Sequence, residues 1–348
     1  MRFNTRSLSN FNTNDSILVD GIVPVGSVTF KDVKIVSYGS GFATSHGYLQ
    51  NESFVKESTI LPMYEMADLV NRWEVEAKIT IDSKKYEAET LDKAVILTSS
   101  FDGNYQHFLV ETLPKLYFLN QNYHVDIPVV ISNSSFIVDI VTVAFPDIKF
   151  TFVDNEHFVK IEKSALFITP FSRNLDGFHP YMIDALRFFS DLIIKECNSV
   201  SSSEKKLFIS RRRNKSNTGH GRVMLNQDCV VETLSDFDYS EIAFEGLTFK
   251  EKAEALKNTT AVVTPIGANI MNLVFARNLM DVIIISHATA FPGAGWFRTL
   301  IEIFNPKANI ITIFEDVTIS AENEKDGNVP YEVNIESLKR VLDERAIK

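Results

Sequence analysis

The sequence predicts an α/β protein built from two units, and three observations support this prediction. From residue 94 onward, strand-like apolar runs alternate with helix-like segments, as in parallel sheets with crossover helices. A polar, serine-rich break at residues 199–204 divides this alternation into two series. The length of 348 residues also exceeds the roughly 100–200 residues of one domain.

Composition narrows the class of protein. The net charge of −10 and a pI near 5.3 argue against a nucleic-acid binder. The two cysteines, Cys197 and Cys229, are too few for a disulfide framework and are typical of a reducing cytoplasm. No apolar run resembles a signal peptide or a membrane span. We therefore expect a soluble cytoplasmic protein, with peripheral attachment to a membrane and the oligomeric state left open.

The elements follow from these patterns in chain order. Residues 1–92 are predicted to form an antiparallel lead-in, because short β-like runs at 17–19, 22–28 and 33–38 are divided by Gly, Asn and Ser. We interpret residues 75–90 as a further hairpin. Residues 93–198 form the first α/β unit. Its predicted strands are 94–98, 129–132, 149–153 and 165–169, and its predicted helices are 104–121, 134–144 and 181–197.

Residues 199–348 form the second α/β unit. Its predicted strands are 206–210, 240–244, 261–263, 282–286 and 310–314, and its predicted helices lie near 226–235, 248–257, 268–275, 296–304 and 334–345. Two such units are expected to hold a ligand in a cleft at the carboxyl ends of their strands.

The first group of candidate functional residues follows the strand at 94–98. If the residues there are helical, Asn104, His107 and Glu111 share one narrow face. A histidine beside a glutamate that orients it can act as a general base, whereas a surface pair without a function is the alternative. Pro114 has no N–H, so we expect the helix to kink or stop there.

The second group is a basic stretch in an otherwise acidic chain. Seven lysines and arginines lie between residues 205 and 222. Arginine binds phosphate oxygens through two parallel hydrogen bonds, so Arg211, Arg212 and Arg222 are candidates for binding a diphosphate. A solvated basic loop and a nucleic-acid contact are the alternatives, and the acidic total disfavours the second.

The third group lies where a strand, a glycine turn and a helix follow one another. Pro265 and Gly267 end the strand, and the predicted helix starts at Ala268. The N–H groups at a helix start bind anionic groups such as phosphate. Asn269 and Asn272 lie one turn apart and can hydrogen-bond a sugar or a phosphate. Most such turns bind nothing, and that is the alternative.

The remaining signals are weaker. His287 ends a predicted strand and is expected to face the cleft, although a packed histidine fits the pattern equally well. Asp236 and Asp238 have the spacing of a metal-binding Asp-x-Asp, but a solvated turn is favoured. No zinc-site spacing with a third ligand occurs, so we expect no metal site.

In their order and spacing, the three groups resemble glycosyltransferase family 61, over about residues 95–305. That family has an Asn-x-x-His-x-x-x-Glu-x-Leu-Pro-[Arg/Lys] element, an Ile-Ser-Arg element with a later Arg and Asn-[Glu/Gln], and a Gly-x-His-Gly-Ala-x-x-x-Asn element. In this chain they correspond to Asn104, His107, Glu111, Leu113, Pro114 and Lys115; to Ile209, Ser210, Arg211, Arg222, Asn226 and Gln227; and to Pro265, Ile266, Gly267, Ala268 and Asn272.

The resemblance implies a GT-B-like arrangement of two Rossmann-like domains and inversion at the anomeric carbon, with no obligatory metal or other cofactor. It implies an acceptor domain at 93–198 and a donor domain at 199–348. His107 or Glu111 would be the base, with Asp102 beside them, and Asn104 and Lys115 would contact the acceptor. The donor-binding candidates are Ser210, Arg211, Arg212, Arg222, Asn226, Gly267, Ala268, Asn269, Asn272 and His287.

One departure from the family pattern matters. Ile266 stands where the family usually has a histidine, and an isoleucine can neither donate to a phosphate nor take a proton. The leading hypothesis is a glycosyltransferase of bacterial capsular or lipopolysaccharide synthesis that uses a nucleotide-sugar donor and an oligo- or polysaccharide acceptor. The alternative is an inactive homologue that binds glycan or acts as a scaffold in a polysaccharide-assembly complex.

Overall fold

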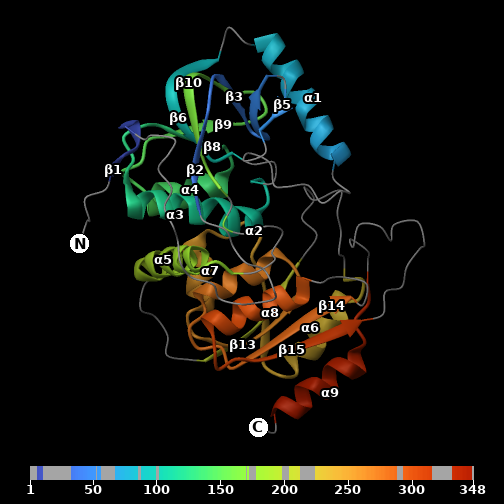
Figure 1. Ribbon diagram of the computed structural model, residues 1–348. Helices are drawn as coiled ribbons and strands as arrows, with labels where there is room; N and C mark the ends of the chain where they lie inside the picture. Colours follow the sequence, from blue (N-terminus) through green and yellow to red (C-terminus); the bar gives the residue numbers. More distant parts are fainter. Residues whose placement is uncertain are drawn as a thin grey trace. The chain divides into compact units, whose positions relative to one another are not determined.

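The computed structural model describes residues 6–10, 33–51, 53–55, 67–84, 88–98, 102–169, 171, 178–197, 204–211, 224–287, 293–315 and 331–346. The chain divides into two compact units, Met1–Phe189 and Ser190–Lys348. Both combine parallel strands with helices, so the α/β class is confirmed (Figure 1). No helix in these described ranges is long and apolar enough to cross a membrane.

A sheet of eight strands forms the described core of the first unit, in the order β5-β4-β3-β10-β6-β8-β9, with β2 also paired to β10. Strands β10, β6, β8 and β9 are parallel, whereas β2 and β3 pair with β10 in the antiparallel sense. The strands are β2 (Ile35–Tyr38), β3 (Gly41–Thr44), β4 (Gly47–Gln50), β5 (Ser53–Phe54), β6 (Glu89–Ile96), β8 (Val129–Ser132), β9 (Phe150–Val153) and β10 (Val159–Ile168).

The helices of the first unit begin close to the predicted positions after each parallel strand. They are α2 (Tyr105–His107), η3 (Phe108–Thr112), α3 (Leu113–Asn122), α4 (Ser135–Ala144) and α5 (Pro180–Glu196), which contains the boundary between the units. Two short strands, β1 (Arg6–Ser7) and β7 (Tyr123–His124), pair in parallel, and η1 (Leu8–Asn10) follows β1. The predicted strands at 17–19 and 22–28 lie outside the described residues.

The hairpin predicted at residues 75–90 was wrong, because α1 (Ala67–Lys84) occupies most of that range. The alternating apolar residues suggested a strand, yet Val75 and Ile79 are 54% and 63% exposed. The buried residues are Ala77 and Ile81, which are four apart, as on one face of a helix.

A sheet of five parallel strands forms the described core of the second unit, in the order β12-β11-β13-β14-β15. The strands are β11 (Lys205–Ser210), β12 (Tyr239–Ala243), β13 (Thr259–Pro265), β14 (Asp281–His287) and β15 (Asn309–Glu315). The helices are α6 (Gln227–Ser235), α7 (Phe249–Leu256), η4 (Ala268–Phe275), α8 (Gly293–Phe304) and α9 (Ile335–Ala346).

The sheet of the second unit is buried on both faces, as continuous apolar strands predict. On one face, Phe208, Val263 and Ile283 pack with apolar residues of α6 and α9. Their strand neighbours Val262 and Ile284 point to the other face and are also fully buried. The strands and helices predicted for this unit are confirmed, except that η4 is a 3₁₀-helix and not an α-helix.

Candidate functional site

His107 and Glu111 form a contact pair at the start of the helical segment after β6. His107 Nδ1 lies 2.8 Å from Glu111 Oε1, and the two side chains are 26% and 11% exposed. Asn104 caps α2, and its Oδ1 accepts from the Gln106 N–H at 3.0 Å. His107 and Glu111 are therefore in contact, with the glutamate placed to orient the histidine ring, whereas Asn104 is the extended N-cap of α2 and does not belong to a helical face.

The helix that carries this pair does not run as one regular α-helix. Residues Phe108–Thr112 form a π-helix, in which the Leu113 N–H donates to the Phe108 carbonyl. Pro114 follows in the first turn of α3, where its missing N–H is tolerated, whereas the same residue inside a helix would interrupt it. The expected kink thus takes the form of a wide turn, and π turns of this kind are frequent at functional sites.

Asp102 holds this helical segment against the sheet. It is 1% exposed, and it accepts hydrogen bonds from Thr112 Oγ1 at 2.8 Å and Ser132 Oγ at 3.0 Å. Thr112 ends η3 and Ser132 ends β8, so one buried carboxyl group links two elements. Lys115, predicted at the acceptor, is also buried, at 7% exposed. Sequence reasoning missed Thr112 and Ser132 because isolated hydroxyl residues carry no motif.

In the second unit, the strand register brings two predicted groups together. Phe208 pairs with Val263, and Val263 pairs with Ile283, so the ends of β11, β13 and β14 lie at one edge. Ser210, at the end of β11, is fully buried, and its hydroxyl has no hydrogen-bond partner among the described residues. Arg211 follows it and is partly exposed. The end of β11, with Ser210 and Arg211, and the glycine turn after β13 therefore lie at neighbouring strand ends.

The turn after β13 depends on Gly267, which has φ 146° and ψ −170°, a conformation that is essentially restricted to glycine. Its carbonyl accepts from the Ile270 N–H at 3.0 Å, which starts η4, and Ala268 is the partly buried first residue of that helix. The Asn272 side chain, 1% exposed, donates to the Asn269 carbonyl at 3.0 Å. Asn272 thus stabilises the turn from inside, and the buried Asn269 Nδ2 has no partner in the described part of the chain.

Replacing Gly267 by alanine is expected to lower the free energy of unfolding by about 1–3 kcal/mol, because a Cβ does not tolerate this conformation. Urea denaturation measures the change. Gly295→Ala is the matched control, since a Cβ there meets no atom within 4 Å and the residue lies in α8. That variant is expected to be unchanged or up to about 1 kcal/mol more stable. Equal losses for both variants would contradict the conformational argument.

The other residues predicted to bind the donor either make contacts within the protein or lie outside the described residues. Asn226 Nδ2 donates to the Val333 carbonyl at 2.8 Å, and the Val333 N–H donates to Asn226 Oδ1 at 2.9 Å. These two hydrogen bonds fix the segment before α9. Gln227 donates to Glu241 Oε1 at 3.1 Å. The backbone of His287 ends β14, but its side chain lies outside the described residues. Arg212 and Arg222 lie wholly outside them.

Comparison with known families decides the identity. Residues 105–283 match the family described as Glycosyltransferase 61, which is just over half of the 348 residues. The chain belongs to the glycosyltransferase 61 family. The matched region runs from α2 to β14 and so includes both the His107–Glu111 pair and the turn at Gly267. No curated protein sequence matches the chain.

The structure also places the residue that departs from the glycosyltransferase 61 pattern. Ile266 is 2% exposed, and its N–H donates to the Ile285 carbonyl at 2.8 Å. The isoleucine therefore continues the pairing between β13 and β14 and packs its side chain inside the unit. In this glycosyltransferase 61 chain, the side chain at position 266 therefore has no hydrogen-bonding group to offer.

Proposed function

We propose that the chain is an inverting, metal-independent glycosyltransferase that moves a sugar from a nucleotide-sugar donor to a glycan acceptor. Membership of the glycosyltransferase 61 family implies glycosyl transfer. The observation that carries the finer proposal is the His107–Glu111 contact of 2.8 Å, because it prepares a base. We further propose a GT-B-like division of labour, with the acceptor on the first unit and the donor on the second.

In this proposal His107 takes the proton from the attacking acceptor hydroxyl. We assign the tautomer in which Nδ1–H donates to the Glu111 carboxylate, so that the lone pair is at Nε2, the proton-accepting atom of the proposal. The hydroxyl oxygen forms its bond to the anomeric carbon while the bond to the diphosphate oxygen breaks on the opposite side, which inverts the configuration. Glu111 stabilises the imidazolium that results.

Asp102 and Lys115 have other roles in this proposal. Both are buried, so we assign Asp102 to positioning η3 and leave Lys115 out of acceptor binding. Asn104, which is exposed, remains the proposed acceptor contact at the start of α2.

The departing nucleoside diphosphate needs positive charge and N–H donors. Arg211 supplies a guanidinium at the end of β11, and the turn after Gly267 supplies backbone N–H groups at the neighbouring strand end. These groups can do the work of a divalent ion, which is why we propose a reaction without metal. The setting we propose is bacterial capsular or lipopolysaccharide synthesis at the inner face of the membrane.

Binding of nucleoside diphosphates tests the donor side. A panel of uridine, guanosine, cytidine and thymidine diphosphates is titrated, and the shift in melting temperature is measured. We expect one of them to stabilise the wild-type protein, and Arg211→Gln to weaken that binding by roughly tenfold or more. Arg298→Gln, which removes only an exposed pair with Glu302, is the control and is expected to bind like wild type.

Incubation with nucleotide sugars and glycan acceptors then tests the transfer itself. Release of nucleoside diphosphate that depends on acceptor, with inverted configuration in the product, is the expected result. If no nucleoside diphosphate binds and no donor is consumed, the proposed function is wrong.

A further inference from the structure

A cavity of about 390 Å³ opens in the first unit, beside the ends of β8 and β9. Residues that follow these strands line it together with Gly103 and the turn between β3 and β4. A smaller cavity of about 170 Å³ shares Ser45, His46, Asp154 and Asn155 with it. Binding pockets for small molecules usually measure roughly 300–1,000 Å³, so the larger cavity has the size of a ligand site.

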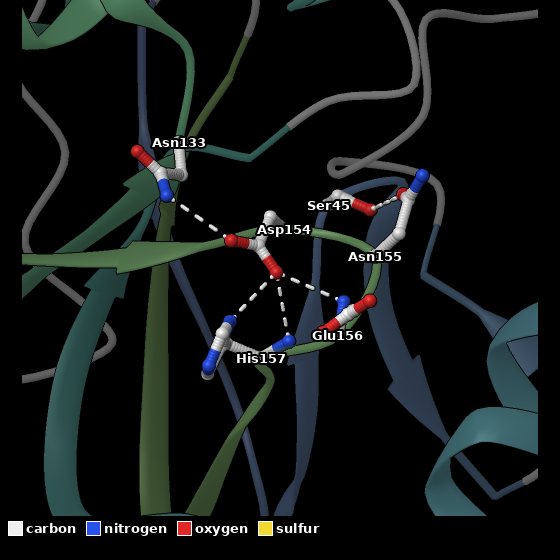
Figure 2. Close-up of polar contacts among 6 residues, drawn as sticks. All are labelled: Ser45, Asn133, Asp154, Asn155, Glu156 and His157. Atoms are coloured by element: carbon white, nitrogen blue, oxygen red, sulfur yellow. Dashed lines mark hydrogen bonds and ion pairs between the residues drawn. The ribbon is translucent and has the colours of Figure 1, made fainter.

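Asp154 is the most strongly held group of this cavity (Figure 2). Its Oδ1 accepts from the Glu156 N–H at 2.8 Å and from both the N–H and Nδ1 of His157 at 2.9 Å. Its Oδ2 accepts from Asn133 Nδ2 at 3.1 Å. Burial raises the pKa of Asp154, but the combined effect of these hydrogen bonds is larger and lowers the pKa well below its ordinary value. The carboxylate is therefore charged and fixed in place at neutral pH.

The fixed groups leave hydrogen-bonding capacity toward the cavity. A carboxylate oxygen accepts two hydrogen bonds, and Oδ2 of Asp154 accepts only from Asn133 among the described residues. Ser45 donates its hydroxyl proton to Asn155 Oδ1 at 2.9 Å, so its oxygen keeps lone pairs for a donor (Figure 2). Oriented acceptors of this kind match the hydroxyl donors of a sugar ring.

The charge of the cavity selects among saccharides. Two carboxyl groups, of Asp154 and Glu156, line it, and no lysine or arginine occurs among its described lining residues. Burial lowers the pKa of His46 against the opposing effect of the nearby Glu76, which favours the neutral ring. His157 also lines the cavity, but its Nδ1 is already bonded to Asp154, so a carboxylate or phosphate on the ligand would meet two carboxyl groups and no lysine or arginine of the described lining.

We propose that this cavity binds a neutral saccharide through Asn133, Asp154 and Ser45 and excludes anionic ones. Within the proposed function, on which this assignment rests, the saccharide is the acceptor glycan. The chain segment that carries the proposed base also borders the cavity. Gly103 lines it one residue before the cap of α2, and Ser132 lines it while donating to Asp102. The cavity is thus linked to the segment that carries His107 in two ways, by Gly103 in the same segment and by the hydrogen bond from Ser132 to Asp102.

Saturation-transfer NMR on the full chain, without any donor, tests this site. The probes are neutral methyl hexopyranosides and the matching methyl hexopyranosiduronates. We expect saturation of a neutral glycoside and not of its uronate. Asp154→Asn keeps an acceptor for the Glu156 and His157 N–H groups but removes the charge, and Asn133→Ala removes one donor without touching that turn. Each variant is expected to weaken binding by roughly tenfold or more.

Asp92→Asn is the matched control, because it neutralises an exposed carboxylate that pairs with Lys163. It is expected to bind the neutral glycoside like wild type. The inference is overturned if the uronate binds as well as the neutral glycoside, if neither binds, or if Asp154→Asn and Asn133→Ala bind like wild type. Failure of the proposed function shows separately, as absent nucleoside diphosphate binding, because this test contains no nucleotide.

Discussion

Replacing His107 by alanine is expected to lower the rate of glycosyl transfer by roughly 10²–10⁴-fold, because the variant has no group to take the proton from the acceptor. Binding of nucleoside diphosphate is expected to stay at the wild-type level, since His107 belongs to the first unit and the proposed donor groups to the second. Steady-state transfer with saturating donor, together with a separate nucleotide titration, measures both quantities. A loss confined to the transfer rate would support the proposed role.

Two further variants separate this role from general damage and from the competing assignment. His124→Ala removes an exposed histidine at the end of β7 and is expected to transfer at the wild-type rate. Glu111→Gln keeps a side-chain oxygen near Nδ1 and is expected to lose less activity than His107→Ala. If Glu111→Gln abolishes transfer while His107→Ala retains it, Glu111 is the base and the assignment made here is wrong.

Replacing Asp102 by alanine is expected to lower the free energy of unfolding by about 2–4 kcal/mol. The variant leaves two buried hydroxyl groups, on Thr112 and Ser132, without their acceptor, and each such loss costs about 1–3 kcal/mol. It also releases η3 from the end of β8, so transfer by the folded variant is expected to fall while nucleotide binding persists. Urea denaturation followed by circular dichroism gives the stability change.

Comparison with Asp92 shows whether burial is the cause. Asp92→Ala removes an exposed ion pair with Lys163 and is expected to change stability by less than about 0.5 kcal/mol. Asp102→Asn, which keeps one acceptor oxygen, is expected to lie between Asp102→Ala and wild type. A loss for Asp102→Ala no larger than that for Asp92→Ala would refute the proposed anchoring.

Much of the second unit could be predicted from the sequence because its signals are local. Buried strands such as β13 and β14 are continuous apolar runs, and the helices between them have apolar residues at helical spacing. The turn at Gly267 could be predicted because glycine after proline marks a break. The 3₁₀ geometry of η4 could not, since the apolar spacing of so short a helix does not distinguish a 3₁₀-helix from an α-helix.

The first unit shows where local signals stop. The alternation of apolar and polar residues around Val75 and Ile79 is typical of a strand. The burial of Ala77 and Ile81, four residues apart, identifies the inner face of α1, and this burial is not visible in the sequence. The spacing of His107 and Glu111 predicted their contact, because four residues make about one helical turn. The contacts of Asp102, in contrast, join residues up to 30 positions apart, and no short motif encodes them.

The wide turn of η3 has a consequence for how relatives of this chain are compared. A π turn holds one residue more than an α-helical turn, so the residues before it are rotated by about 100° relative to a regular continuation of α3. His107 precedes this extra residue and Pro114 follows it. A chain with one residue fewer between the two could keep the same histidine and proline yet aim its imidazole toward a different side of the molecule. The number of residues between the histidine and the proline therefore decides the direction of the imidazole as much as the presence of the two residues does.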